Sequence, residues 1–554
     1  MAIYFGGELE TEIPDIDLVG FTLARARALG DRPALIDGTS GRTIGYAQLE
    51  RDVRALAAGL AARGFGRGDT FAIYMPNAPE YAIAFYGAIA AGGRCTTINP
   101  LYTARELAHQ LADSRARMLL TAPAFLDAAR EAVADLDCEL FVLGEIQDMG
   151  LDPDAGDDGE PGDSDRGEVG TNVEADGPHG ARPKPFAELF GDPGAAPQPE
   201  GDPAHDIAAL PYSSGTTGLS KGVMLSHRNL VANMLQMAPV LRMRTDEETM
   251  IAVLPLFHIY GLSVIMNYGL WSGATLVTMG RFELQAYLDL SERHRVTRAY
   301  VVPPIALALA HHPAVEGRDL SHLRAIVCGA APLGVELEDA CTERIGAPVI
   351  QAYGMTELSP GATVSPLGQP RRPGSVGPPL PGTECRLVDP ASERDVESGE
   401  RGELWVRGPQ VMCGYLNNDA ATAAMVDSEG WLRTGDVATV DEDGWFWIVD
   451  RVKELIKYKG FQVAPAELEA ILITHPDVAD CAVIGIPDEQ AGELPKAFVV
   501  SAASGCDTEA VMDFVCAQVA PHKRIREIEL VREIPKSPSG KILRRVLREQ
   551  APLA

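Results

Sequence analysis

Residues 211–223 have the sequence Pro-Tyr-Ser-Ser-Gly-Thr-Thr-Gly-Leu-Ser-Lys-Gly-Val and follow an apolar run, Ile207–Leu210, that predicts a buried strand. Residues 213–222 include five small hydroxyl residues, three glycines and one lysine, Lys221. Glycines let the backbone approach a ligand, hydroxyl and amide groups donate to phosphate oxygens, and the lysine adds positive charge. A flexible linker has a similar composition, but linkers rarely lie between an apolar strand and an amphipathic run such as Leu225–Met237. The stretch therefore predicts a phosphate-binding loop.

Four further motifs follow this loop along the chain. They are Leu254–Tyr260 (LPLFHIY), Gln351–Glu357 (QAYGMTE), Thr434–Asp436 (TGD) and Asp450–Glu454 (DRVKE). Together they resemble the adenylate-forming superfamily, which holds acyl-CoA synthetases, peptide-synthetase adenylation domains and beetle luciferases. Within that superfamily the chain is most similar to 4-coumarate–CoA ligases, and the resemblance covers nearly its whole length.

Length and composition bound the class of protein. The chain has 554 residues, which is too long for one compact core and predicts two or more domains. A hydrophobic content of 46% predicts a globular protein, and a net charge of −30 argues against non-specific nucleic-acid binding. Residues 1–18 carry no lysine or arginine, so no signal peptide is expected, and no apolar run is long enough to be a transmembrane segment. The nine cysteines contain no Cys-x-x-Cys pair, which favours a reducing cytoplasm over a disulfide framework or a zinc site. The oligomeric state, monomer or homodimer, stays open.

The order of apolar runs predicts the fold. Strands and helices alternate through the first part of the chain, which predicts layered α/β sheets. A proline- and glycine-rich stretch, 366–381, then leads into a small β-rich subdomain. The expected strands include 34–37, 70–75, 95–98, 251–256, 299–302, 325–328, 349–351, 403–407 and 445–449.

The chain is expected to divide into three parts. Residues 1–449 are predicted to be an adenylation domain that binds ATP and the acid, residues 450–455 a hinge, and residues 456–554 a small, mobile α+β lid domain that also binds AMP. Residues 145–205 are expected to be an acidic, disordered insertion. Its first part, 145–180, holds twelve acids, one base and no aromatic residue, so it has little apolar surface to bury.

The resemblance implies the residues that hold the nucleotide. Tyr353 is expected to stack on adenine, and Asp436 to accept both ribose hydroxyls, since a carboxylate offers two acceptors at that spacing. The alternative for Asp436 is an ordinary turn aspartate. Glu357 and Thr217 are the candidate Mg²⁺ ligands, and the alternative for Glu357 is a surface acid. The expected ATP- or AMP-binding residues are Ser213, Ser214, Gly215, Thr216, Thr217, Gly218, Lys221, Gln351, Ala352, Tyr353, Gly354, Thr356, Asp436, Arg451, Lys453 and Lys541.

The resemblance also implies two candidate catalytic residues, one near the middle of the chain and one near its C-terminus. Lys541, which ends the run Pro538–Lys541, resembles the lysine that reaches from the small domain to the reacting carboxylate and phosphate. A lysine on such a turn is otherwise commonly exposed. His258 matches a position that lines the acyl site, although a histidine in an apolar run is more often a core residue.

The resemblance implies that the remaining candidates act in a second step, in which coenzyme A receives the acyl group. Lys459 and Gly460 resemble the contact with coenzyme A, and Arg281 is a further candidate for it. Lys457 and Gln462 flank that contact and complete the candidate catalytic set. The small domain would present the catalytic lysine in one orientation and this loop in another, with Lys453 at the hinge.

The acid pocket is where the sequence departs from the hydroxycinnamate ligases. Ser263 stands where they usually have asparagine, Val327 where many have lysine, and Gly361 where they have a bulkier residue. These changes predict a wider, more apolar pocket that admits other aryl acids or fatty acids. The expected pocket residues are His258, Tyr260, Gly261, Ser263, Val327, Gly329, Ala330, Pro360 and Gly361.

The sequence therefore predicts an ATP- and Mg²⁺-dependent acid–CoA ligase. The acid and ATP would give an acyl-adenylate and pyrophosphate, and coenzyme A, as co-substrate, would then give the thioester. The alternatives are an adenylating enzyme that loads a carrier protein, a luciferase-like oxygenase and a catalytically dead nucleotide sensor.

Overall fold

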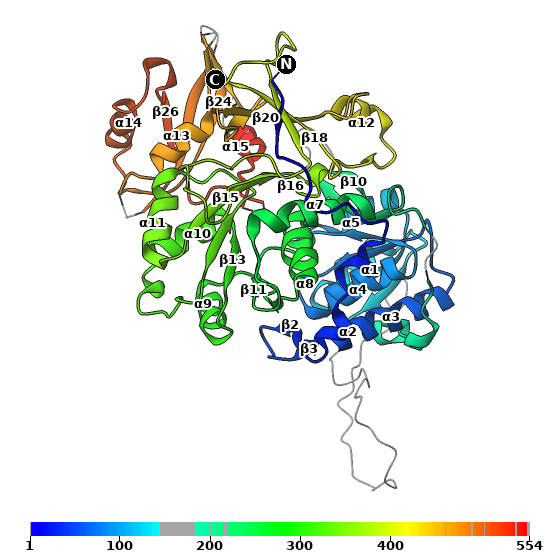
Figure 1. The fold of residues 1–554 in the computed structure, drawn as a ribbon. Helices are drawn as coiled ribbons and strands as arrows, with labels where there is room; N and C mark the ends of the chain where they lie inside the picture. The colour runs from blue at the N-terminus through cyan, green and yellow to red at the C-terminus, as the bar shows by residue number, and fades with distance from the viewer. Residues whose placement is uncertain are drawn as a thin grey trace. The chain divides into compact units, whose positions relative to one another are not determined.

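The computed structural model describes residues 2–144, 183–198, 201–213, 220–459, 461–488, 491–502, 505–537 and 540–550. The chain forms two compact units (Figure 1). The first comprises residues 1–50, 77–82 and 201–554, and the second comprises residues 51–76 and 83–200. The hinge and domain boundaries expected near residue 450 are not tested by this division and stay predictions.

Parallel strands form the sheet of the second unit. They lie in the order β5 (Arg94–Thr97), β4 (Thr70–Tyr74), β6 (Ala116–Thr121), β7 (Glu139–Val142) and β8 (Lys184–Pro185). Helices α5 (Ala104–Ser114) and α6 (Leu126–Val133) contribute to its apolar core. A capping box begins α5, because Thr103 and Glu106 each accept a hydrogen bond from the other's backbone N–H.

The structure corrects the expected end of the acidic insertion. Residues 145–182 lie outside the described residues, so that part of the prediction stays open. Residues 183–198, in contrast, belong to the folded unit, since β8 pairs with β7 and Phe186 and Leu189 are fully buried. The insertion therefore ends before residue 183 rather than at 205, because these two apolar side chains supply the surface that the acidic run lacks.

The large sheet of the first unit positions the candidate site. In the described part of the chain it has six parallel strands, with one antiparallel strand at each edge. The order is β16 (Gly361–Val364), β15 (Val349–Gly354), β14 (Ala325–Cys328), β13 (Arg298–Val301), β11 (Thr249–Ala252), β12 (Thr275–Thr278), β2 (Pro33–Asp37) and β3 (Thr43–Gly45). Because the carboxyl ends of parallel strands meet at one edge, the segments after β11, β13 and β14 and the end of β15 converge there.

Helices accompany this sheet in the same unit (Figure 1). A π-helix, η5 (Tyr260–Asn267), follows the LPLFHIY motif and runs directly into α8 (Tyr268–Trp271). Further α-helices among the described residues are α1 (Leu18–Thr22), α2 (Ala26–Leu29), α3 (Tyr46–Ala62), α4 (Pro79–Ala90), α7 (His227–Leu241), α9 (Leu284–Arg293), α10 (Pro303–His311), α11 (Val335–Ile345) and α12 (Asp419–Met425).

The phosphate-loop stretch connects two paired strands. Strand β9 (Ile207–Ser213) is the predicted buried strand, and it pairs antiparallel with β10 (Lys221–Ser226). Strand β19 (Gly414–Tyr415) pairs with the other edge of β10. The amphipathic run therefore begins as a strand and becomes helical only from His227.

The β-rich subdomain and the C-terminal region both match the expected fold class. The subdomain is an antiparallel sheet in the order β1 (Tyr4–Phe5), β17 (Glu384–Val388), β18 (Gly402–Arg407), β20 (Leu432–Val440) and β21 (Phe446–Arg451). The C-terminal region has its own core between a sheet and three helices. Its elements are β22 (Ile456–Tyr458), β23 (Phe461–Val463), α13 (Pro465–Leu472), β24 (Val478–Asp488), β25 (Gly492–Ser501), α14 (Thr508–Cys516), β26 (Glu527–Leu530) and α15 (Arg544–Gln550).

Two expectations from composition also agree with the structure. All nine cysteines fall within the described residues, and each is a free thiol. Among those residues, the structure contains no helix with both the length and the apolar character needed to span a membrane.

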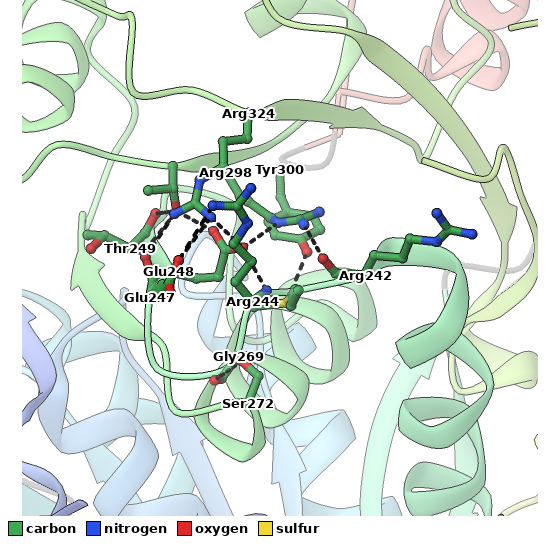
Figure 2. A network of polar contacts seen from close by, with 12 residues as sticks. Arg242, Arg244, Glu247, Glu248, Thr249, Gly269, Ser272, Arg298, Tyr300 and Arg324 are labelled. Atoms are coloured by element: carbon green, nitrogen blue, oxygen red, sulfur yellow. Dashed lines mark hydrogen bonds and ion pairs between the residues drawn. The ribbon is translucent and has the colours of Figure 1, made fainter. Parts of the chain in front are cut away.

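A buried ion pair fastens the large sheet (Figure 2). Glu248 and Arg298 have side chains that are 0% and 2% exposed, and the Arg298 Nε lies 3.2 Å from a Glu248 oxygen. Burial alone would raise the pKa of Glu248. The Thr297 hydroxyl, the Arg244 N–H and the nearby guanidinium groups outweigh that effect and lower it. The carboxylate is therefore held ionised inside the sheet.

The same network fixes the segment that follows α7. Arg298 donates to the carbonyl of Arg242 over 2.9 Å, and the Tyr300 hydroxyl lies 3.7 Å from the Met243 sulfur. Tyr300 in turn packs edge-on against Tyr260, with ring centroids 6.3 Å apart. The ion pair thus supports the two helices, α7 and η5, that line the site described below.

We predict that Glu248→Gln lowers the thermal unfolding midpoint by several degrees at pH 7, because Arg298 is then buried without a counter-ion, a loss of about 3–5 kcal/mol. The folded-state pKa of Glu248 lies below its ordinary value of 4.5, so its contribution is complete above that value and is lost as the pH falls through the lowered pKa. Melting curves from pH 7 to pH 3.5 should show the two midpoints converging. Glu247→Gln, at a side chain that is 60% exposed, is the matched control and should change little. Equal midpoints of wild type and Glu248→Gln at pH 7 would contradict the prediction.

Candidate active site

A cavity of about 60 Å³ lies at the carboxyl edge of the parallel strands, between α7 and η5. Seven of the expected pocket residues line it, namely His258, Tyr260, Val327, Gly329, Ala330, Pro360 and Gly361. Gly261 and Ser263 are not among the lining residues. The sequence analysis missed Met237, Leu241, Ile259, Val264, Met355 and Val364, most of which come from helix faces that only folding brings to the cavity.

The polar side chains on the cavity wall are already engaged within the protein. The Tyr260 hydroxyl donates to the Val327 carbonyl over 3.0 Å, and the Tyr353 hydroxyl donates to Asp436 over 2.6 Å. The His258 Nδ1 accepts from the backbone N–H of Tyr260 over 3.2 Å. The cavity therefore suits an apolar molecule, since its wall adds few hydrogen-bonding groups.

Close backbone packing shapes the wall at two glycines. A side chain at Gly354 would put its Cβ 2.0 Å from the Pro360 carbonyl oxygen, so the position requires glycine. A Cβ at Gly329 would lie 3.3 Å from the Tyr260 ring. The wall has little room for larger residues at either place.

The nucleotide sugar has a candidate site where β20 pairs with β21. Asp436 lies directly opposite Arg451, and the Arg451 Nε is 3.1 Å from one carboxylate oxygen. The other oxygen accepts from Tyr353, whose pKa is raised by burial and by the charge of Asp436. The predicted adenine residue and the predicted ribose residues are thus in direct contact, a fact that the sequence could suggest only through the resemblance.

A second group lies at the ends of the phosphate-loop stretch. Ser213 and Lys221 are directly paired, and the Ser213 hydroxyl donates to Glu357 over 3.0 Å. Glu357 is 4% exposed, so the structure does not support the surface-acid alternative. The Tyr415 hydroxyl also donates to it, over 2.8 Å. Sequence analysis missed Tyr415 altogether. The loop residues between the paired ends, Ser214, Gly215, Thr216, Thr217 and Gly218, lie outside the described residues.

The group around Glu357 fits a magnesium ion that is held partly by a nucleotide. No cluster of three or more potential protein ligands occurs among the described residues, so they form no closed metal cage. Magnesium usually binds proteins through one or two carboxylates and completes its shell with phosphates and water. A single buried carboxylate beside a phosphate loop has that character, with Thr217 outside the described residues.

The C-terminal region brings its lysine to the same edge of the sheet. Gly540 lies close to Val302 and Pro304, at the start of α10. Burial and the charge of Arg451 lower the pKa of Lys541 to about 8, against the opposing effect of Asp436. The solvent-exposed alternative for Lys541 therefore fails.

His258 is affected by the same lysine. Burial and the charge of Lys541 lower the pKa of His258 to about 4. The imidazole is consequently neutral at pH 7, and it contributes a dipole rather than a charge.

Several of the other expected residues contact neither the cavity nor the residues around Asp436 and Glu357. Lys453, Lys457, Lys459 and Arg281 are exposed. Gly460 and the Gln462 side chain lie outside the described part of the structure. Gln351 is buried, but its amide bonds Leu333 and Glu338, so it holds a loop in place.

The fold and this geometry define an enzyme of the class that activates a carboxylic acid with ATP. Residues 23–416 match the AMP-binding enzyme family, and residues 467–541 match the AMP-binding enzyme C-terminal domain. The chain belongs to the AMP-binding enzyme family.

Individual relatives agree with that assignment. The chain is 40% identical to 4-coumarate–CoA ligase 1 of Petroselinum crispum, over 94% of this chain and 91% of that protein. It is 41% identical to 4-coumarate–CoA ligase 5 of Oryza sativa subsp. japonica, over 97% and 95% of the two chains. Its structure is similar to that of the anthranilate CoA ligase AuaEII in complex with anthranoyl-AMP (TM-score 0.82, 27% identity, covering 98% and 99%). It is also similar to ATP-bound MatB from Rhodopseudomonas palustris (TM-score 0.80, 28% identity, covering 97% and 99%).

The predicted enzyme class and fold class are both confirmed. The chain is an AMP-forming acid–thiol ligase of mixed α/β fold, with a large N-terminal and a small C-terminal part. ATP and coenzyme A are the co-substrates expected of this family.

We predict an alkaline limb in the pH profile of adenylate formation. The specificity constant for ATP reports the free enzyme. It should therefore hold to about pH 7 and fall as Lys541 loses its proton, through a pKa of about 8. No acid limb from His258 should appear above about pH 4. ATP–pyrophosphate exchange at low ATP, from pH 5 to 10, measures the alkaline limb and checks that no acid limb appears in that range. Lys541→Met should be slow and lack the alkaline limb, and an unchanged limb in that variant would assign it to another group.

Proposed function

We propose that this ligase activates a cinnamate-type aryl acid and transfers the acyl group to coenzyme A. The observation that carries the proposal is the apolar cavity that opens beside His258 and near Lys541, with its polar wall groups already bonded. A flat aromatic ring suits such a wall. The relatives named for 4-coumarate and anthranilate, both aryl acids, support the same substrate class.

In the first half-reaction the carboxylate attacks the α-phosphate. A carboxylate–phosphorus bond forms, the bond to pyrophosphate breaks, and the acyl-adenylate results. Because two anions meet, we assign Lys541 to neutralise the charge that develops between them. Asp436 and Tyr353 would hold the ribose and adenine, and His258 would orient the carboxylate as a neutral group.

The phosphate end would hold the leaving group. Lys221 and the hydroxyl-rich loop would bind the β- and γ-phosphates, and Glu357 with Thr217 would hold Mg²⁺. The bound ion would supply charge screening for the phosphate oxygens. A buried carboxylate directly beside the Ser213–Lys221 pair supports this assignment.

In the second half-reaction the coenzyme A thiolate attacks the acyl carbon, a carbon–sulfur bond forms, and AMP leaves. We propose that the C-terminal region then turns about the hinge at 450–455 and presents Lys459 and Gly460. Lys453, Lys457 and Lys459 are exposed in the present arrangement, which leaves them available for that second orientation. The nine free thiols support a reducing, cytoplasmic location for the enzyme.

A medium- or long-chain fatty acid is the second candidate substrate, and one observation favours it. A further cavity, of about 200 Å³, has a mixed lining that includes Ala238 of α7, Tyr268 and Trp271 of α8, and the polar side chains of Arg25, Thr245 and Ser272. Helix α7 also lines the acid cavity, and α8 directly continues η5. A long chain would need both spaces.

We predict that cinnamate rivals 4-coumarate as a substrate. Val327 has no side-chain donor, and its carbonyl already accepts from Tyr260. A phenolic hydroxyl should therefore gain at most one hydrogen bond, about 0.5–1.5 kcal/mol or several-fold in specificity constant. ATP–pyrophosphate exchange with cinnamates, benzoates and fatty acids of graded length measures the order. A hundredfold preference for 4-coumarate would refute the apolar-wall argument, and a preference for long chains would establish the second candidate.

We also predict that two substitutions separate the half-reactions. Lys541→Ala should slow adenylate formation by about 10²–10³-fold, the usual effect of removing one preorganised donor, yet form thioester normally from supplied acyl-AMP. Lys541→Arg should not rescue, since a planar guanidinium cannot place a point charge at the same spot. Gly460→Leu should do the reverse by blocking the thiol. Single-turnover rates of each step decide the matter, and equal losses in both steps for both variants would exclude the two-orientation mechanism.

A further inference from the structure

Tyr415 lies between Lys221, a candidate phosphate-binding residue, and Glu357, a candidate Mg²⁺ ligand. It belongs to none of the motifs that the sequence analysis identified. Its side chain is 1% exposed. Its hydroxyl donates to a Glu357 oxygen over 2.8 Å, and the Lys221 ammonium lies 4.3 Å from the centre of its ring. One aromatic side chain therefore contacts both the carboxylate and the lysine.

Strand register explains how these residues meet. In the antiparallel pairing of β10 with β19, Tyr415 lies opposite Val223, two residues beyond Lys221. Residues two apart share a face, so Lys221 and Tyr415 are diagonal neighbours on one side of the sheet. Ser213, directly opposite Lys221 on β9, lies on that side too.

The backbone around Tyr415 is fixed to both of its partners' elements. Cys413 and Leu416 donate to the carbonyls of Met224 and Gly222 on β10. The N–H of Met412 donates to the carbonyl of Glu357 itself, over 2.9 Å. The tyrosine is thus held in place without help from either side chain that it contacts.

The contacts leave the reactive parts of both groups available. Ser213 and Tyr415 both donate to the same oxygen of Glu357, Oε1, and among the described residues no donor reaches the other oxygen. Among the described residues, no carboxylate forms an ion pair with Lys221, and its ammonium lies over the ring of Tyr415.

We propose that Tyr415 is a positioning residue for the phosphate and metal end of the site. It orients the Glu357 carboxylate by a hydrogen bond and holds the Lys221 ammonium against its ring, so that both are in place before ATP and Mg²⁺ arrive. The proposal rests on the proposed functions of Glu357 and Lys221. It deepens them by assigning the side chain that sets their separation.

The test compares two substitutions that dissect the two contacts. Tyr415→Phe keeps the ring beside Lys221 and removes the hydrogen bond to Glu357, whereas Tyr415→Leu removes both. The matched control is Tyr46→Phe, which also removes a buried hydroxyl, one that donates to the Ala274 carbonyl over 2.6 Å. Binding of Mn²⁺ to the enzyme–ATP complex, followed by electron paramagnetic resonance, and ATP affinity without metal are measured for each.

Tyr415→Phe should weaken Mn²⁺ binding about tenfold and leave metal-free ATP affinity unchanged, since only the hydrogen bond to a charged group is lost. Tyr415→Leu should in addition weaken metal-free ATP binding several-fold, because Lys221 loses its ring contact. In ATP–pyrophosphate exchange, Tyr415→Phe should raise the half-saturating Mg²⁺ concentration by a similar factor and change the saturating rate less than threefold. Combining Tyr415→Phe with Glu357→Gln should add nothing to the effect of Glu357→Gln alone.

Two results would overturn the proposal. One is wild-type Mn²⁺ affinity in Tyr415→Phe, and the other is an equal loss in Tyr46→Phe, which would mark a general effect of burying one hydroxyl fewer. If Glu357→Gln itself leaves Mn²⁺ binding unchanged, the proposed role of Glu357 fails instead. Should one Tyr415 variant not fold, the other still decides, because both remove the hydroxyl that orients the carboxylate.

Discussion

A carboxylate and a triphosphate repel each other, and an enzyme that joins them must gather positive charge where they meet. In this protein the positive groups that we propose for this task come from places far apart in the chain. Lys221 begins β10, Arg451 ends β21, and Lys541 belongs to the C-terminal region. Their charges act over one edge of the large sheet, where parallel strands end together. Burial is the main cause of the lowered pKa of Lys541, and the positive charge of Arg451 adds to it.

Burial gives these few charges their effect. Because the cavity beside His258 is apolar, fields from Lys541 and Arg451 are screened less there than in water. The same environment keeps His258 neutral, with a pKa of about 4, so it adds no further positive charge. The polar side chains on the cavity wall are already hydrogen-bonded within the protein, so under the proposed function shape and apolar contact would select the acid.

Other parts of the molecule hold this edge of the sheet in position. The Glu248–Arg298 pair links the starts of β11 and β13 and fixes the segment after α7. Helix α7 itself carries part of the cavity wall. At the phosphate end the support comes from strand pairing rather than from an ion pair, because β19 places Tyr415 between Glu357 and Lys221. A buried ion pair thus supports the wall of the acid cavity, and the register of β10 with β19 supports the residues proposed to bind phosphate and Mg²⁺.

The sequence by itself predicted the α/β fold and several of its strands, because apolar runs are local patterns. Its motifs resemble a known superfamily, and that resemblance gave the enzyme class and selected Glu357, Asp436, Tyr353 and Lys541. Only the tertiary structure decided what depends on register and helix faces. It moved the end of the acidic insertion, brought Met237 and Val264 to the acid cavity in place of Ser263, and put Tyr415 beside Lys221. Such contacts join residues that are distant in the sequence, and no local pattern records which strands will pair.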